Sequence, residues 1–261
     1  METGLTVRID PHVHSEGSYD GTEPVDRILS HARDIGLDGV VITDHDVIDE
    51  SLRAVELAPE YGLIGIPGVE VSTAHGHLLA IGVEDLPESG QSFERTVDEV
   101  RTLGGVAIVP HPFQRSRHGV SKRHIRHCDA VEVYNSMVFT GYRNRRAHAF
   151  ARRRQFPVVG ASDAHSLPWV GRAYTEIDVP VAESVDSVDA EQITTAIRNG
   201  TTNIEGSRTP ILRSASQYTK GAIRKTGCTV SARFPILGSP TQYVRERGLT
   251  HRLVRGTGDE R

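Results

Sequence analysis

Cysteine is scarce in this chain, whose 261 residues include only Cys128 and Cys228. Two cysteines cannot build a disulfide scaffold, so we expect a reducing, cytoplasmic environment. No apolar run approaches the roughly 20 residues of a membrane span, and residues 1–4 lack the basic and apolar regions of a secretory signal. The remaining composition, 37% hydrophobic and 25% charged, is typical of one large globular domain with a smaller appendage.

Charge is distributed unevenly along the chain. Residues 206–261 carry 11 Lys and Arg against 3 Asp and Glu, a balance of +8, while the whole chain has a net charge of −4. The body therefore carries −12. Two interpretations of this basic extension, which also contains several Gly and Pro, stay open. It packs on the acidic body as a neutralising strap, or it holds a polyanionic substrate such as RNA.

Short apolar runs alternate with helical patterns about seven times. This alternation predicts an α/β protein with a mainly parallel sheet. Strands are expected near residues 5–9, 39–43, 63–66, 68–72, 77–83, 106–109, 130–134, 157–160 and 173–177, and helices near 24–35, 50–61, 92–103, 121–127, 141–154 and 190–199. Polar residues follow most strands rather than one pair of them. A closed barrel, whose loops share one rim, is favoured over an open sheet with one switch point.

Histidine and carboxylate residues occupy these strand ends. His12 and His14 follow the first strand, and side chains at i and i+2 of an extended segment point to the same side, so both can bind one metal ion. The full set comprises six histidines and three carboxylates: His12, His14, Asp20, His45, Glu70, His77, His111, Asp163 and His165. Nitrogen and carboxylate ligands without cysteine suit Zn, Mn or Fe(II). Nine ligands would hold two or three ions, with one carboxylate bridging a pair.

The motifs D-P-H-V-H-S, I-T-D-H-D, G-V-E-V-S, H-L-L-A-I-G, P-H-P and S-D-A-H, in that order, resemble the PHP (polymerase and histidinol phosphatase) domain over about residues 7–205. The resemblance implies a distorted (β/α)7 barrel that hydrolyses phosphoesters, a domain at 5–205 and an extension at 206–261. It implies two or three divalent ions, with manganese favoured over zinc or iron. The implied ligand sets are His12, His14, Glu70 and Asp163; Glu70, His77 and His111; and Asp20, His45 and His165.

Asp20 bears on the substrate, because some members of the family, notably histidinol-phosphatase-like ones, have His at this position. Asp resembles a branch of small enzymes that act on nucleoside 3′,5′-bisphosphates or trim short RNA from the 5′ end as exonucleases. The rival hypotheses are a histidinol-phosphate phosphatase, a DNA nuclease and a non-catalytic metal-binding regulatory module. An incomplete ligand set would mark the last of these, and this set is complete.

Catalytic roles are expected for Glu70, Asp163 and His165. His165 or a metal-bound water would protonate the leaving group, and the sequence leaves this choice open. A second set of residues is expected to bind substrate: Arg115, Arg117, Arg172 and Asn135. The arginines follow strand ends that carry ligands, and each could donate two hydrogen bonds to a second phosphate. A position in a solvated loop, without contact to substrate, is an equal alternative for each of them.

Several neighbouring residues have competing interpretations. We expect Asp10 and Asp44 to orient ligand imidazoles, and Glu132 to be either a participant or a buried strand carboxylate balanced by Arg. His75 is an alternative to His77. The other histidines, including His118, are expected at the surface. The six arginines of the helix at 141–154 are more simply a solvated basic face than a nucleic-acid groove.

Overall fold

The computed structural model describes residues 4–114, 118–138, 141–180 and 182–209. The chain divides into one unit at residues 1–217 and another at residues 218–261, which lies outside the described residues. The predicted basic extension is therefore outside them from residue 210 onward. No helix in the described part of the chain is long and apolar enough to span a membrane.

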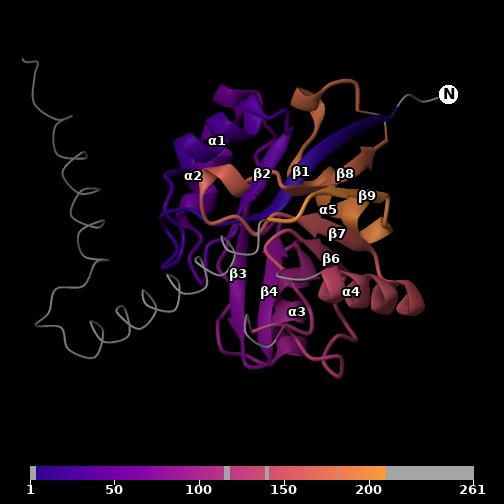
Figure 1. Ribbon diagram of the computed structural model, residues 1–261. Helices are drawn as coiled ribbons and strands as arrows, with labels where there is room; N and C mark the ends of the chain where they lie inside the picture. The colour runs from indigo at the N-terminus through magenta and orange to yellow at the C-terminus, as the bar shows by residue number, and fades with distance from the viewer. Residues whose placement is uncertain (1–3, 115–117, 139–140, 181, 210–261) are drawn as a thin grey trace, which may run out of the picture. The chain divides into compact units, whose positions relative to one another are not determined.

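Two sheets form the centre of the first unit (Figure 1). The four-stranded sheet has the order β2-β1-β8-β9, and the five-stranded sheet has the order β3-β4-β5-β6-β7. The strands are β1 (Leu5–Val13), β2 (Gly39–Ile42), β3 (Gly68–Thr73), β4 (Gly76–Ile81), β5 (Val106–Val109), β6 (Ala130–Asn135), β7 (Val158–Ala161), β8 (Ala173–Val179) and β9 (Thr202–Gly206).

The pairing is mixed, so the expectation of a mainly parallel sheet was wrong. Strands β1 and β2, β5 and β6, and β6 and β7 pair in parallel, whereas β1 and β8, β8 and β9, β3 and β4, and β4 and β5 pair antiparallel. A two-residue connection between β3 and β4 permits only an antiparallel hairpin. The predicted α/β class is confirmed.

Isolated parallel bridges connect the two sheets. Val13 at the end of β1 pairs with Ala164, just beyond β7, and His45, just beyond β2, pairs with Glu70 of β3. These bridges replace continuous ladders at the two places where a regular barrel would close. One bridge joins two predicted metal ligands, and the other lies beside predicted ligands in sequence. The barrel is therefore distorted where the predicted ligands lie.

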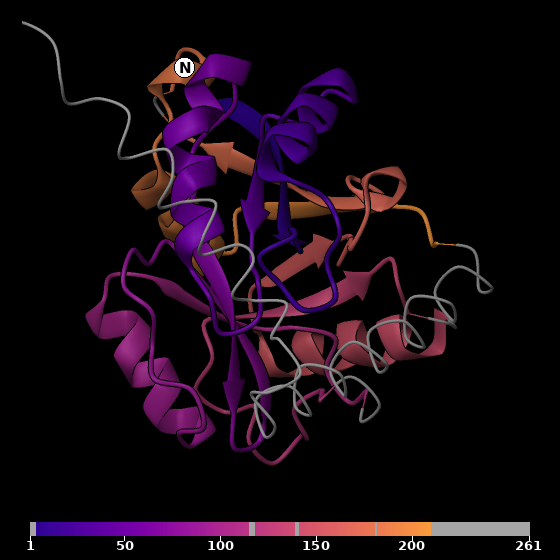
Figure 2. The same cartoon turned by 90° about the vertical axis from the view of Figure 1, so that its left-hand side faces the viewer.

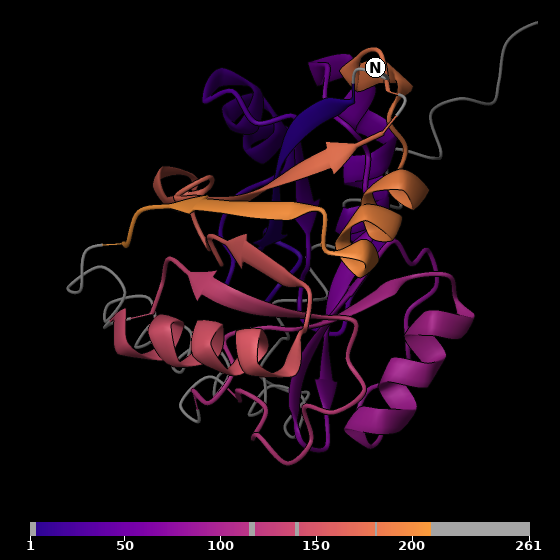
Figure 3. The same ribbon diagram turned by 90° about the vertical axis from the view of Figure 1, so that its right-hand side faces the viewer.

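In the part of the chain that the structure describes, five α-helices cover the sheets: α1 (Val25–Asp34), α2 (Asp49–Leu57), α3 (Phe93–Thr102), α4 (Gly141–Arg154) and α5 (Ala190–Asn199). The side views show α1 and α2 beside the four-stranded sheet and α3 and α4 beside the five-stranded one (Figures 2 and 3). Three-residue and four-residue 3-10 helices occur at Ala58–Tyr61, Leu167–Trp169 and Val185–Ser187. Local sequence sets helix ends: α5 begins with a capping box between Asp189 and Gln192 and ends at Gly200, whose φ is +71°.

Three local expectations were wrong. Residues 121–127 form turns rather than a helix, since so short a segment with mostly exposed polar residues cannot stabilise a helix by packing. Residues 63–66 contribute one bridge, between Ile64 and Gly39, instead of a strand. The polar edge strand β9 carries no apolar alternation and was not expected.

The hydrophobic core lies on both faces of the five-stranded sheet. Along β4, Leu78 and Ala80 pack in a cluster with residues of α3 and α4, whereas Leu79 and Ile81 pack in a second cluster with residues of α5. This alternation follows the two-residue period of a strand. With both faces covered, the sheet is a rigid support for the polar residues at its edge.

Candidate metal centre

All nine predicted ligands gather at one place. Eight are buried, with exposures of 0 to 7%, and the side chain of His45 is 8% exposed. Overlapping groups of three, with ligand atoms within 4.8 Å of one another, include every one of the nine: His12, His111 and Asp163; His12, His14 and Glu70; His14, Asp163 and His165; His14, Asp20 and His45; and His45, Glu70 and His77.

Four of these side chains place ligand atoms at distances that suit a tetrahedral ion. The Nε2 atoms of His12 and His14 lie 3.2 Å apart, and each lies 3.2 to 3.3 Å from Oε2 of Glu70. Both lie 3.6 Å from Oδ1 of Asp163. A tetrahedral ion with ligands at about 2.1 Å needs ligand atoms about 3.4 Å apart. The four residues of the first predicted ligand set therefore fit one divalent metal ion.

Glu70 faces two groups of histidines at once. Its Oε2 faces His12 and His14, whereas its Oε1 lies 2.9 Å from Nδ1 of His77 and 3.2 Å from Nε2 of His111. β3 presents this carboxylate between β1 and β4. One carboxylate with an oxygen in each group is the arrangement that a bridging ligand of two ions requires.

A third group lies around Asp20. Its Oδ2 is 3.1 Å from Nε2 of His165 and 3.3 Å from Nε2 of His45. The loop after β1 turns back sharply to bring Asp20 there. At Gly21 an added Cβ would collide with the carbonyl oxygen of Ser15, so a residue with a side chain is excluded from this turn.

A layer of buried polar groups supports the ligands. Glu132 of β6 accepts hydrogen bonds from Nδ1 of His12 at 3.0 Å and from the backbone N–H of His111 at 2.6 Å. Asn135 donates from Nδ2 to Glu132 and to Oδ2 of Asp163, both at 2.9 Å. Second-layer partners of this kind fix the tautomer and the direction of metal ligands. The sequence left the role of Glu132 open, and its partner is His12 rather than an arginine.

Asp10 and Asp44 do not orient imidazoles, so that expectation was wrong. Asp10 accepts hydrogen bonds from the backbone N–H groups of Ser162 and Gly171. Asp44 accepts from the backbone N–H of Ser15, at 2.7 Å, and from its hydroxyl. Burial raises the pKa of both carboxyl groups, that of Asp10 to about 6. These two residues hold the loops that carry the ligands.

The carboxylates and imidazoles of the cluster favour each other's charged forms. Burial opposes a charge on His12, yet the carboxylates of Glu70 and Glu132 raise its pKa to about 9. Burial likewise opposes ionisation of Glu70 and Asp20, and the surrounding imidazoles nevertheless hold the pKa of both well below the usual range. Nδ1 of His12 donates its proton to Glu132. Nε2 of His12 then carries a lone pair that points at oxygen atoms of Glu70 and Asp163. Two acceptors that face each other are unfavourable unless a proton or a metal ion lies between them.

Two of the four predicted substrate-binding residues, Arg172 and Asn135, belong to the described part of the chain. Arg115 and Arg117 lie outside the described residues. Arg172 places its guanidinium 5.4 Å from the ring centre of Trp169, and one of its nitrogens donates to the hydroxyl of Ser207 at 3.3 Å. Asn135 is 1% exposed, and its side chain is bonded to buried groups, which favours a positioning role over contact with substrate.

Two aromatic rings stack on ligands of the cluster at positions that sequence spacing does not indicate. His118, expected at the surface, stacks on His77 with ring centres 5.1 Å apart, and its carbonyl accepts the backbone N–H of His77. Tyr19 stacks on His45 at 4.9 Å. His75 instead stacks on His124, with its Nδ1 accepting the backbone N–H of Phe93, so it does not replace His77 in the cluster.

Comparison with known proteins agrees with this geometry. The PHP domain model matches residues 10–144, and the PHP-associated model matches residues 141–202. An uncharacterized protein of Methanocaldococcus jannaschii is 30% identical over 142 residues, which are 50% of this chain and 82% of that protein.

Two solved structures share the fold. One is a two-domain protein of Bacteroides vulgatus containing a predicted PHP-like metal-dependent phosphoesterase, with a TM-score of 0.64, 21% identity, and coverage of 82% of this chain and 70% of that one. The other, described as a putative metal-dependent phosphoesterase of Bifidobacterium adolescentis, has a TM-score of 0.55, 19% identity, and coverage of 74% of this chain and 96% of that one. The predicted PHP-type fold is confirmed.

Proposed function

The chain belongs to the PHP domain family of metal-dependent phosphoesterases, and we propose that it removes phosphate from nucleoside 3′,5′-bisphosphates or trims short RNA from the 5′ end. The division of Glu70 between two groups of histidines supports the metal-dependent reaction, and Asp20 in the third group supports the choice of a nucleotide substrate. Together they support a site in which one carboxylate bridges two ions, with Asp20, His45 and His165 holding a third.

Divalent metal ions bound there would supply a water of low pKa as nucleophile and neutralise charge on the phosphoryl group. The residues of the chain prepare this site. Glu132 holds the N–H of His12 at Nδ1, which leaves Nε2 directed into the cluster. Asn135 binds Oδ2 of Asp163 and leaves Oδ1 directed toward His12 and His14. Burial excludes bulk water, so each of these interactions acts in a low dielectric.

His165 belongs to the third group as a ligand. Its Nδ1 lies 2.8 Å from the backbone carbonyl of Asp163, which accepts the Nδ1 proton and sets the direction of the ring. Its Nε2, 3.1 Å from Oδ2 of Asp20, is then the atom that would bind a metal ion, so we do not assign protonation of the leaving oxygen to His165. Asp163 thus contributes to two groups, through its carboxylate to the first ligand set and through its carbonyl to His165.

The charge of the centre favours an anionic substrate. Four buried carboxylates belong to the cluster, namely Asp20, Glu70, Glu132 and Asp163, and Asp10 and Asp44 are buried beside it. Divalent ions held by these carboxylates would attract the negatively charged oxygens of a phosphate. The second phosphate of a bisphosphate needs further cations, for which Arg115, Arg117 and Arg172 remain our proposal.

A substrate panel tests the proposal. The Mn²⁺-loaded chain is assayed with a nucleoside 3′,5′-bisphosphate, a short 5′-phosphorylated RNA and histidinol phosphate. We expect turnover of at least one nucleotide substrate and a loss of about 100-fold or more in Glu70→Gln. Glu176→Gln, a change on β8 outside the cluster, is the matched control. Faster turnover of histidinol phosphate than of both nucleotides would overturn the substrate assignment, and a fully active Glu70→Gln would overturn the site.

A further inference from the structure

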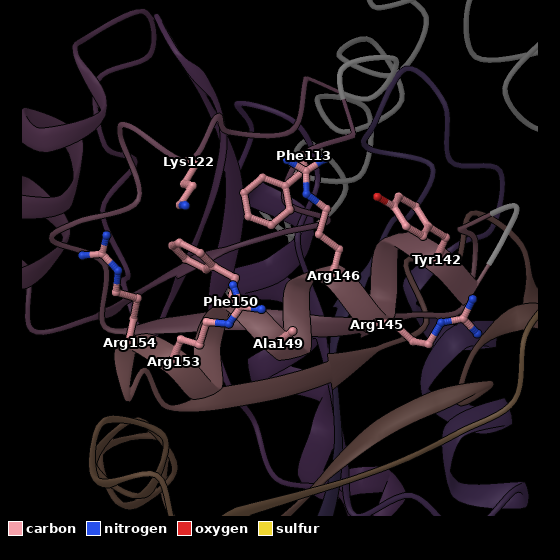
Figure 4. A pocket seen from close by; sticks show the side chains of 9 residues that line it. All are labelled: Phe113, Lys122, Tyr142, Arg145, Arg146, Ala149, Phe150, Arg153 and Arg154. Atoms are coloured by element: carbon pink, nitrogen blue, oxygen red, sulfur yellow. The ribbon is translucent and has the colours of Figure 1, made fainter.

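A pocket of about 410 Å³ lies along α4, outside the candidate metal centre (Figure 4). From α4 it is lined by an aromatic and cationic set: Tyr142, Arg145, Arg146, Phe150, Arg153 and Arg154. Phe113 and Lys122 line it from the segment that follows β5. No Asp or Glu is among the described residues that line this pocket, so its five cationic side chains face no lining carboxylate.

The lining residues of α4 form one stripe of the helix. Positions 142, 145, 146, 149, 150, 153 and 154 follow the three- and four-residue spacing of a single helix face. The stripe extends from residue 142 to residue 154, or about 18 Å at 1.5 Å per residue. Favourable interaction with the helix dipole explains basic residues in the last turn only. It does not explain Arg145 and Arg146 in the first half of α4. Phe150 packs in the core against Phe113, whereas the ring of Tyr142 is exposed.

Aromatic and cationic groups alternate within the pocket. The guanidinium of Arg146 lies 4.5 Å from the ring centre of Phe113. Tyr142 is 62% exposed, more than either of the other two large exposed hydrophobic residues of the described chain, Ile35 and Leu86. Single-stranded nucleic acids are bound by this combination, in which basic side chains follow the phosphates and exposed rings stack on bases. An acidic peptide would use the charges and leave Tyr142 without a role.

The pocket continues beyond Tyr142 and Arg145. A second pocket, of about 840 Å³, shares these two residues and extends between α4 and β9 toward Arg208. Beside the middle of the stripe lies Phe113, next to Arg146 (Figure 4). Phe113 follows His111 by two residues, so their Cα atoms lie within about 7 Å. A binding surface that extends along a helix and passes beside the metal centre suits a polymer better than a small anion.

We propose that the α4 pocket binds a single-stranded nucleic acid segment whose end occupies the metal centre. The inference rests on the proposed function for the choice of substrate end, but the binding itself requires no hydrolysis. The proposed function left two substrates, a nucleoside bisphosphate and a short RNA. Binding along α4 favours the RNA.

Binding of labelled oligouridylate of about eight nucleotides to the full chain, measured by fluorescence anisotropy across a range of salt concentrations, tests the proposal. The pocket variant is the triple Arg145→Gln, Arg146→Gln and Arg153→Gln. The control removes the same charge at exposed arginines outside the pocket: Arg27→Gln, Arg95→Gln and Arg152→Gln. Each phosphate contact contributes about 0.7 to the salt slope for a single strand, so the pocket triple should lower the slope by about 2 and the control triple should not.

Tyr142→Ala should weaken oligonucleotide binding about 5-fold or more without changing the salt slope, because stacking involves no counterion release. Equal effects of the two triple variants would overturn the proposal, and so would polyglutamate binding that matches the oligonucleotide and is insensitive to Tyr142→Ala. Hydrolysis of the same oligonucleotide is measured separately. Tight, pocket-dependent binding without hydrolysis would contradict only the proposed function, whereas hydrolysis unaffected by the pocket triple would contradict only the present inference.

Discussion

Replacing Glu132 by Gln should separate metal binding from folding. One carboxylate oxygen of Glu132 accepts the N–H of His12, and the other accepts the backbone N–H of His111 and a hydrogen of Asn135. A glutamine has only one acceptor oxygen. If that oxygen faces His111 and Asn135, the amide N–H₂ faces Nδ1 of His12 and favours the tautomer that carries its proton on Nε2, the atom directed into the cluster.

The opposite orientation of the glutamine places its N–H₂ against two donors. Unsatisfied buried groups cost about 1 to 3 kcal/mol each, so the first orientation is favoured and the metal-binding nitrogen of His12 becomes protonated. Losing a second-layer partner typically lowers metal affinity by about 10- to 100-fold. We expect a loss in this range for Glu132→Gln, equal to about 1.4 to 2.8 kcal/mol of binding free energy.

Competition with a chromophoric chelator for Mn²⁺ or Zn²⁺ measures this affinity, and circular dichroism reports whether the variant folds. Glu176→Gln removes a strand carboxylate that pairs weakly with Arg8, at 3.9 Å, and should bind metal like the parent. A folded Glu132→Gln protein with unchanged metal affinity would refute the argument that Glu132 sets the tautomer of His12.

Other expected outcomes follow from the same cluster and from the core. Chelation should lower Tm by about 5 to 10 °C, because ligand at 100 times Kd stabilises by about 2.7 kcal/mol. His14→Ala should bind fewer ions than the parent, and Glu70→Ala fewer still, as metal analysis of purified protein would show; equal contents would argue against a bridging carboxylate. Burial raises the pKa of the Cys128 thiol to about 12, so in a Cys228→Ser background an alkylating reagent should label it only in urea. The pKa of Asp10 is about 6 in the folded protein and 3.8 for a solvated Asp side chain. The folded state therefore binds a proton at Asp10 more tightly than the unfolded state does. As the pH rises from about 4 to 6, loss of this proton lowers the free energy of unfolding. Relative to Asp10→Asn, the parent should therefore lose up to about 3 kcal/mol across that window in urea unfolding at successive pH values, and a constant difference would contradict the raised pKa.

Most ligand candidates could be located from the sequence, because the directions of their side chains follow from the local period of a strand. A strand places alternate side chains on one side, which brings His12 and His14 together, and polar residues at the ends of neighbouring strands meet at one rim. Helices with clear start and stop signals, such as the one from 190 to 199, were predicted with the bounds that the structure has. The hairpin at residues 74–75 and the polar edge strand β9 were not, because pairing partners distant in sequence determine them.

Tertiary structure alone decided which polar groups support the ligands and which do not. Glu132 and Asp10 are both buried strand carboxylates, and no local pattern distinguishes the one that binds His12 from the one that binds backbone N–H groups. The strand register settles this, including the irregularity between Glu132 and Tyr134 on β6. The α4 stripe likewise resembles a solvated face until Phe113, turned by a φ of +67°, closes a pocket against it. Directions of single side chains depend on contacts between segments far apart in the chain, which the order of residues does not express.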